Sequence, residues 1–202
     1  MDKAEQLTRA AKGGDAAVVA RLLSEGAEVD TPNAARRTAL DLAAREGHAE
    51  TVRRLLAAGA DPQQQTGEYG ETTPLCQAAM YGHTEVARVL LEAGAPTCAQ
   101  GRTGWVPMVL AATSTDHGHP ETVDVLLEHG ADIDVAAMKG RTPLEWAALF
   151  GQVRMVHHLL ARGATPTRRA LGEAQTRANG SLKAAKRYAL VIDALQAAGV
   201  AS

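Results

Sequence analysis

Residues 73–95 read TPLCQAAMYGHTEVARVLLEAGA, and this stretch decides the fold. Thr73 can cap a helix because its hydroxyl can accept a backbone N–H bond, and Pro74 suits the first helical position, where its missing donor costs nothing. Gly82 predicts the end of this helix, and Gly94 predicts the end of a second helix whose valines and leucines share one face. The stretch therefore predicts a pair of short helices.

The pattern of this stretch recurs along the chain. The ending Leu-Leu-x-x-Gly-Ala is found at residues 22–27, 55–60, 90–95, 126–131 and 159–164. Its glycines are Gly26, Gly59, Gly94, Gly130 and Gly163, which lie 33, 35, 36 and 33 residues apart. A pair of short helices cannot bury its apolar face alone, but stacked copies bury a continuous core. The spacing predicts a helical solenoid.

The copies resemble the ankyrin repeat, whose motif runs Gly-x-Thr-Pro-Leu-His-x-Ala-Ala-x-x-Gly-His, followed by a Val/Leu-rich helix and Gly-Ala-Asp. The helix starts match as Thr38-Ala-Leu, Thr73-Pro-Leu, Val106-Pro-Met and Thr142-Pro-Leu. The resemblance covers about residues 5–167. It implies an all-α, ankyrin-type solenoid of helix-turn-helix repeats with short β-turn fingers.

One departure from the motif concerns the histidine after Pro-Leu, which is absent from this chain. The four positions hold Asp41, Cys76, Val109 and Glu145. In the family that histidine helps to tie neighbouring repeats through hydrogen bonds. Its absence puts this network in question but not the fold, because apolar burial dominates folding.

The spacing also predicts the limits of the repeats and two irregular segments. We expect one domain over residues 1–167, with five repeats at about 5–33, 34–65, 66–97, 98–134 and 135–167. The finger at 61–72 is two residues longer than the basic unit, and residues 113–120 put three extra residues between the helices of the fourth repeat. Neither segment has a helical pattern.

A capping segment is expected over residues 168–202, with helices at 168–178 and 181–198. Its apolar residues recur every three or four positions and predict a stripe that faces the array: Leu182, Ala185, Ala189, Ile192 and Leu195. The segment from Arg162 to Arg187 is strongly basic and could dock an acidic partner or a nucleic-acid backbone. A solvated face of a capping helix is the favoured interpretation, so nucleic acid is an unlikely partner.

Composition and charge limit the possible functions. A net charge of −2 gives no overall attraction to nucleic acid or anionic membranes. No apolar run approaches the about 20 residues needed to span a bilayer, and the N-terminus has no apolar signal region. Two cysteines, Cys76 and Cys98, make no disulfide framework, so reduced thiols and a cytoplasmic location are expected. Heavy use of Ala, Arg and Gly hints at a bacterial source.

The resemblance implies a binding site on the concave face, formed by the finger tips and the exposed side of each first helix. The residues expected there are Tyr69, Met80, Tyr81, Arg102, Trp105, Lys139, Arg141, Leu149 and Phe150. Four of the six aromatic residues of the chain are in this set, and aromatic side chains dominate binding hot spots. The alternative is that Tyr81 and Phe150 only pack against the next repeat.

Other chemistries find little support in the sequence. Asp116, His117 and His119 lie close together, but there is no four-ligand pattern, and His48, His83 and His119 stand where the motif has a structural histidine. We therefore expect no metal and no cofactor. Cys76 could be a reactive thiol near a helix N-terminus, although a buried, inert cysteine is the default. The common catalytic motifs are absent.

The sequence therefore predicts a non-catalytic scaffold that binds an unidentified partner protein across its concave face. The alternative is an enzyme or small-molecule-binding protein with a pocket near the 65–72 finger or the 113–120 loop. Such a site would need a closed, mostly apolar pocket with convergent polar groups, whereas a scaffold needs only an open groove. Self-association through the same aromatic residues is a third possibility.

Overall fold

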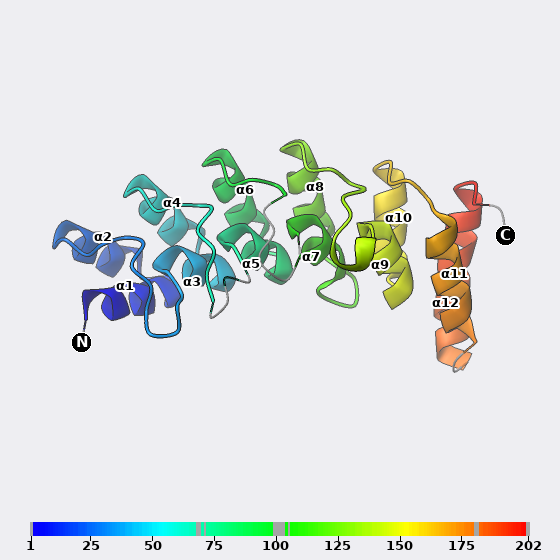
Figure 1. The fold of residues 1–202 in the computed structure, drawn as a ribbon, viewed down its shortest axis with the longest axis horizontal. Coiled ribbons are helices and arrows are strands. Elements are labelled where there is room, and N and C mark those ends of the chain that lie inside the picture. The colour runs from blue at the N-terminus through cyan, green and yellow to red at the C-terminus, as the bar shows by residue number, and fades with distance from the viewer. Residues whose placement is uncertain are drawn as a thin grey trace.

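The computed structural model describes residues 2–67, 70, 72–98, 104, 106–179 and 182–200, with the backbone alone for Met138 and Lys183. Within these ranges the chain forms twelve α-helices and one short 3-10 turn. The helices lie in consecutive pairs along one axis, with the N-terminus and the C-terminus at opposite ends (Figure 1). The predicted all-α solenoid is confirmed.

Each pair has a first helix and a second helix. The first helices are α1 (Lys3–Lys12), α3 (Ala39–Glu46), α5 (Pro74–Tyr81), α7 (Pro107–Thr113) and α9 (Pro143–Phe150). The second helices are α2 (Ala16–Ser24), α4 (Ala49–Ala57), α6 (Thr84–Glu92), α8 (Pro120–Glu128) and α10 (Val153–Ala161). The turn η1 covers Met138–Gly140, and α11 (Arg168–Ala178) and α12 (Leu182–Ala197) close the array.

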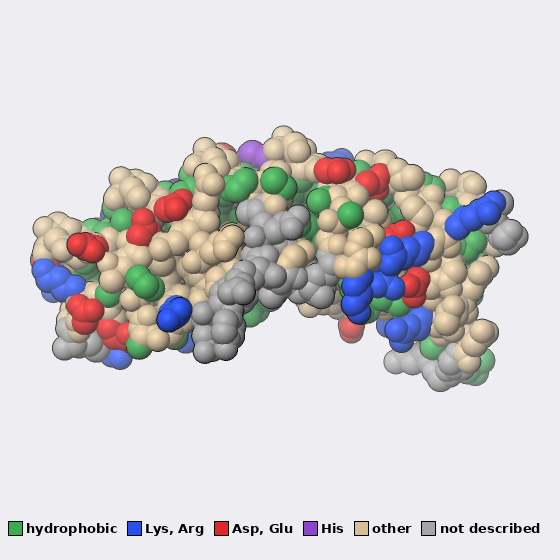
Figure 2. All heavy atoms as spheres, in the orientation of Figure 1, with side chains coloured by type: hydrophobic (Ala, Val, Ile, Leu, Met, Phe, Trp, Pro, Cys, Tyr) green, Lys and Arg blue, Asp and Glu red, His purple; other side chains and the backbone are tan. Residues whose placement is uncertain are grey.

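The first helices pack on one another in order, from α1 through α3, α5, α7 and α9 to α11. The second helices form a separate row along the outer edge (Figure 1). The whole array is arched, and the space-filling view shows the hollow of the arch on the side of the first helices and the fingers (Figure 2). This hollow side is the concave face.

The helix ends follow the local signals in the sequence. The Thr73 side chain accepts a hydrogen bond from Cys76 N, at 3.3 Å, and Pro74 opens α5. Thr142 forms a capping box with Glu145 at the start of α9. The finger before α5 carries a pair of backbone hydrogen bonds between Thr66 and Thr72, which form an isolated antiparallel bridge. Caps and turns therefore position the first helices as expected.

The core is continuous from the first pair to the cap and is rich in leucine and alanine. Each of the first helices α3, α5, α7 and α9 carries an alanine pair with no exposed surface: Ala43 and Ala44, Ala78 and Ala79, Ala111 and Ala112, and Ala147 and Ala148. Small side chains let helix backbones approach closely, which explains how a chain with few aromatic residues buries a core. The second helices contribute fully buried leucines such as Leu55, Leu90, Leu126 and Leu159.

Hydrogen bonds tie each first helix to the next pair. His48 Nε2 lies 3.0 Å from Lys12 O, His83 Nε2 lies 2.9 Å from Arg45 O, and His119 Nε2 lies 3.2 Å from Met80 O. At the next two junctions, Gln152 Nε2 donates to Thr113 O and Tyr188 Oη donates to Leu149 O, at 3.3 and 2.8 Å. The last carbonyls of a helix have no partner within it, so these side chains satisfy them. The three histidines therefore have a structural role.

The ankyrin motif also has a histidine after Pro-Leu, which this chain lacks. At two of these four positions a carboxylate joins neighbouring repeats. Thr66 Oγ1 donates to Asp41 Oδ1 at 2.7 Å, and Thr167 Oγ1 donates to Glu145 Oε1 at 2.9 Å. Thr66 lies in the finger that leads to α5, and Thr167 is the N-cap residue of α11, so each bond joins a first helix to the segment that leads into the next first-row helix. Asp41 and Glu145 therefore supply an inter-repeat network that the sequence had left in question.

Burial of Asp41 leads to a prediction about pH. The Asp41 side chain is fully buried, and desolvation raises the pKa of its carboxyl although Arg37 Nε, 2.8 Å away, and the Thr66 hydroxyl lower it. Because the pKa of this carboxyl is higher in the folded state than in the unfolded state, its contribution to stability is greatest at a pH below its unfolded pKa. That contribution is lost as the pH rises through its folded pKa. We expect Asp41→Asn to flatten the decline of stability from about pH 4 to neutral pH.

Urea unfolding of the two proteins across this pH range measures the effect. Asp116→Asn is the control, because Asp116 is exposed and its replacement makes the same change in side chain and net charge. Parallel stability profiles for the wild-type chain and Asp41→Asn would contradict the prediction.

The cap differs from the prediction in the face that it buries. The buried residues of α12 are Tyr188, Val191, Ala194 and Leu195, whereas Leu182 is 78% exposed and Ala189 is also exposed. Of the expected stripe, Leu195 is buried, and Ile192 and Ala185 are half-buried. Apolar residues lie on more than one side of α12, and the Tyr188 hydrogen bond to Leu149 O fixes which side packs on the array.

Candidate functional site

Two half-exposed aromatic rings lie at the ends of first helices. Tyr81 is 44% exposed at the end of α5, and Phe150 is 43% exposed at the end of α9. Each is the last residue of a first helix and is followed by a glycine. They occupy the same position in two repeats, so the repeat geometry presents them on the same face. Both rings are therefore partly open to solvent, and their role in binding stays a prediction.

The Tyr81 ring is held by two neighbours. It stacks on the His83 ring, with centroids 6.2 Å apart and planes 25° apart, and the Arg45 guanidinium lies 5.6 Å from its centroid. His83 is itself fixed by its hydrogen bond to the Arg45 carbonyl. Met80, beside Tyr81, is half-buried and packs against the core. The exposed ring therefore has a defined orientation.

The Phe150 ring stacks on a buried partner. Trp146 is 7% exposed, and its ring lies 5.7 Å from the Phe150 ring at an angle of 24°. The Arg141 guanidinium lies 5.1 Å from the Trp146 ring on one side and pairs with Glu173 at 2.5 Å on the other. The Arg141 side chain is only 15% exposed. The prediction that Arg141 is available to a partner is therefore wrong, because it already joins α9 to α11.

The remaining residues of the expected site divide into three groups. Leu149 is 8% exposed and packs with Val109 of α7 and with Val106, which precedes that helix, so the prediction that it faces solvent is wrong. Lys139 is exposed in η1. The last group lies outside the described residues: Tyr69, Arg102 and Trp105.

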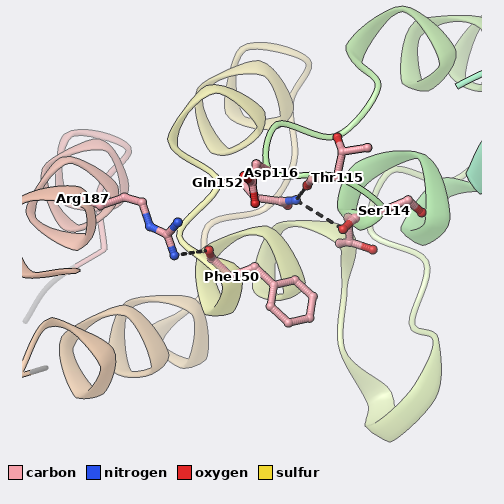
Figure 3. Close-up of a pocket in the computed structure, with 7 residues that line it drawn as sticks. Ser114, Thr115, Asp116, Phe150, Gln152 and Arg187 are labelled. Carbon is pink, nitrogen blue, oxygen red and sulfur yellow. Dashed lines mark hydrogen bonds between the residues drawn. The ribbon is translucent and has the colours of Figure 1, made fainter. Parts of the chain in front are cut away.

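A hollow of about 330 Å³ lies between the inserted segment of the fourth repeat and the cap (Figure 3). It is lined by Thr113, Ser114, Thr115, Asp116, Phe150, Gln152 and Arg187. Gln152 Nε2 donates to the carbonyls of Thr113 and Thr115 and holds this segment, while Arg187 donates to Phe150 O at 2.9 Å (Figure 3). From the sequence, Arg187 is only part of the basic segment 162–187 and Gln152 is not singled out, because no local motif relates either residue to Phe150.

The lining of this hollow is polar apart from the Phe150 ring. Pockets for small molecules are usually mostly apolar, with a few convergent polar groups. The hollow therefore extends the surface around Phe150 and does not form the enclosed pocket that the small-molecule alternative requires.

His158 and Cys76 contribute to the fold and not to a reactive site. Within the described ranges, no group of three or more His, Cys, Asp or Glu side chains could hold a metal ion. His158 Nε2 contacts Asp124 Oδ1 at 2.8 Å between α10 and α8. Cys76 is buried, and desolvation raises the pKa of its thiol. The hypothesis of a reactive, low-pKa Cys76 is therefore wrong, because burial outweighs the nearby helix N-terminus.

The basic segment at the C-terminal end is partly used by the fold. Figure 2 shows Lys and Arg side chains gathered over the C-terminal part of the array. Arg162 pairs with Asp124 at 3.0 Å, and Arg169 donates to the carbonyls of Gly140 and Lys139 at 3.1 and 3.2 Å. Arg187 bonds to the end of α9. The contacts of Arg169 and Arg187 join the cap to the array, and the contact of Arg162 joins the end of α10 to α8.

The fold and the exposed rings define a class of protein, the helical repeat arrays with a preformed concave surface. A family model for ankyrin repeats, in three copies, matches residues 3–66, 63–137 and 97–170. These matches cover most of the chain, which therefore belongs to the ankyrin repeat family. Ankyrin repeats are in general protein–protein interaction modules.

Two further findings complete the comparison. The chain has no match among curated proteins. In the part of the chain that the structure describes, no helix has the length and apolar character of a membrane span.

Proposed function

We propose that this chain is a non-catalytic scaffold that binds a partner protein across its concave face. The observation that carries the proposal is the pair of half-exposed rings, Tyr81 and Phe150, at the same position of two repeats. Exposed aromatic surface is unfavourable in water unless a partner covers it, and aromatic side chains supply much of the energy of protein interfaces. The general role of ankyrin repeats supports the same reading.

The rings are held before any partner arrives. Arg45 and His83 fix Tyr81, and Trp146 supports Phe150. Binding to ordered side chains avoids part of the entropy loss that flexible side chains incur, so the surface favours affinity through pre-organisation. Lys139 would contact acidic groups at the rim.

We include Met80 beside Tyr81 in the proposed surface, together with the sequence candidates Tyr69, Arg102 and Trp105. Cys76 and Cys98 are both free, which suits the reducing cytoplasm that we propose as the compartment. No contact described above favours the small-molecule alternative.

A double variant tests the surface. We expect Tyr81→Ser with Phe150→Ser to abolish capture of the partner while lowering stability by no more than about 1 kcal/mol, because both rings are already half in water. The control is Leu182→Ser with Leu190→Ser, which removes two exposed apolar side chains from α12. The measurement is affinity capture from cells of the source organism, with mass spectrometry, after thermal melts have shown that all three proteins fold.

The outcomes separate the alternatives. A protein retained by the wild-type chain and the control, but lost by the aromatic variant, supports the proposal. Loss with the control alone would transfer the binding site to the cap. Sedimentation of the purified chain tests self-association, and a dimer abolished by the aromatic variant would make the partner a second copy.

A further inference from the structure

A second hollow lies at the N-terminal end of the array and carries a local excess of positive charge. Its volume is about 450 Å³, and it lies between α1, residues 33–37 and α3. It is lined by Glu5, Thr8, Arg9, Lys12, Asn33, Ala35, Arg37, Leu42 and Arg45. Four of these side chains are basic and one is acidic, although the chain as a whole has a net charge of −2.

Three of the four basic side chains are available to a ligand. Arg37 is committed to the buried Asp41. Arg9 and Lys12 are exposed, and within the described part of the chain neither forms an ion pair. Arg45 lies over the Tyr81 ring, and its ion pair with Glu46 is a 4.0 Å contact between two well-exposed side chains, which contributes little. An anion in this hollow would therefore find three cations that no strong ion pair neutralises.

The rest of the lining suits the carboxylate of an acidic side chain. Thr8 and Leu42 are 1% and 7% exposed and form a closed floor for the aliphatic part of such a side chain. Asn33 Oδ1 accepts hydrogen bonds from Ala35 N and Arg37 N, at 3.0 and 3.1 Å. Its amide nitrogen is left as a donor.

The basic hollow is continuous with the proposed binding surface. Arg45 lines the hollow, and its guanidinium also lies 5.6 Å from the centroid of the Tyr81 ring. His83 stacks on Tyr81 and bonds to the Arg45 carbonyl, so the two features are held together as one unit. A ligand with a carboxylate in the hollow would therefore have its next apolar group over the Tyr81 ring.

We propose that the hollow lined by Arg9, Lys12 and Arg45 binds an acidic side chain of the partner protein, and that an apolar or aromatic residue near it in the partner packs on Tyr81. The occupant is thus an acidic–apolar peptide segment. This inference rests on the proposed function, because it describes what the concave face recognises. The charge of the hollow, opposite in sign to that of the whole chain, carries the assignment.

Selection from a displayed library of short random peptides tests the inference without knowledge of the partner. The bait is the full chain, compared with three variants. In the hollow variant Arg9, Lys12 and Arg45 are changed to Gln, and in the charge-matched control Arg21, Arg54 and Arg88 of the second helices are changed to Gln. The aromatic variant is Tyr81→Ser with Phe150→Ser.

We expect the selected peptides to be enriched in Asp or Glu close to an apolar residue. Their affinity should fall about tenfold to a hundredfold in the hollow variant, remain within about twofold in the control, and weaken at higher ionic strength. A synthetic version of a selected peptide, with phosphoserine in place of Asp or Glu, distinguishes a phosphate from a carboxylate as the bound group. If the phosphopeptide bound and the carboxylate peptide did not, the carboxylate assignment would be overturned.

The failures of the two proposals can be distinguished. The selected peptides could lack acidic residues, bind the hollow variant normally and fail to bind the aromatic variant. That result would overturn this inference and leave the proposed function standing. Peptides that bind all variants equally, or a selection that yields none, would count against both.

Discussion

Gly118→Ala should lower the free energy of unfolding by about 2–4 kcal/mol, although Gly118 belongs to the irregular segment of the fourth repeat. Gly118 is buried and has a φ of +64°, where an L side chain is strained. An added Cβ would also lie 2.5 Å from Ala112 O, a backbone atom, and 2.5 Å from Met155 Cε. Backbone strain and the clash therefore act together.

Gly140→Ala is the matched control for this substitution. Gly140 has a similar φ of +61°, but a Cβ added there meets nothing within 4 Å. Its replacement should therefore cost only the conformational strain, about 1 kcal/mol. Urea unfolding followed by circular dichroism measures both variants. Equal losses for the two would show that the inserted segment does not pack on α7 and α10 as the structure describes.

The close packing of Gly118 has a consequence for the binding surface. Gln152 holds the inserted segment through two carbonyls, and the same segment forms one wall of the hollow beside Phe150. An insertion that is anchored in this way acts as a fixed part of the surface. This segment distinguishes the junction of the fourth and fifth repeats from the other junctions. It also forms a fixed wall beside the exposed Phe150 ring.

The sequence predicts the helix pairs well because their signals are local and repeated. A threonine cap such as Thr73, a proline at the first helical position and a glycine stop such as Gly82 each act within a few residues. Five copies of one ending then require stacking, since no single pair can bury its face. The exposure of Tyr81 and Phe150 follows from the same register.

The parts that sequence reasoning missed depend on contacts between distant residues. Arg141 has the position of a surface residue, but it is covered because Glu173, 32 residues later, pairs with it. Leu149 is buried because it packs with Val106 and Val109, at and just before the start of α7, and these contacts have no periodic signal. The basic hollow joins Arg9 and Lys12 of α1 to Arg45 of α3, and repeat spacing alone says nothing about the charge at such a junction.

Leu90→Ala is expected to have the largest effect on stability, a loss of about 3–5 kcal/mol. Leu90 has no exposed surface and lies in α6, at the centre of the continuous core. Removing its side chain gives up apolar burial and leaves a cavity between packed helices that can close only partly. Leu190→Ala removes the same group from α12, where the side chain is 54% exposed, and should change stability by no more than about 0.5 kcal/mol.

The position of Leu90 also predicts how the array unfolds. Each repeat of a solenoid contacts only its neighbours, so weakening the third pair weakens the coupling between the pairs on either side. We expect urea unfolding of Leu90→Ala to become broader than that of the wild-type chain. Tryptophan fluorescence, which reports Trp105 and Trp146, should separate from the helical signal of circular dichroism. If Leu90→Ala proved as stable as Leu190→Ala, the assignment of the Leu90 face of α6 to the core would be wrong. The placement of Tyr81 on the concave face, which rests on that register, would then lose its support.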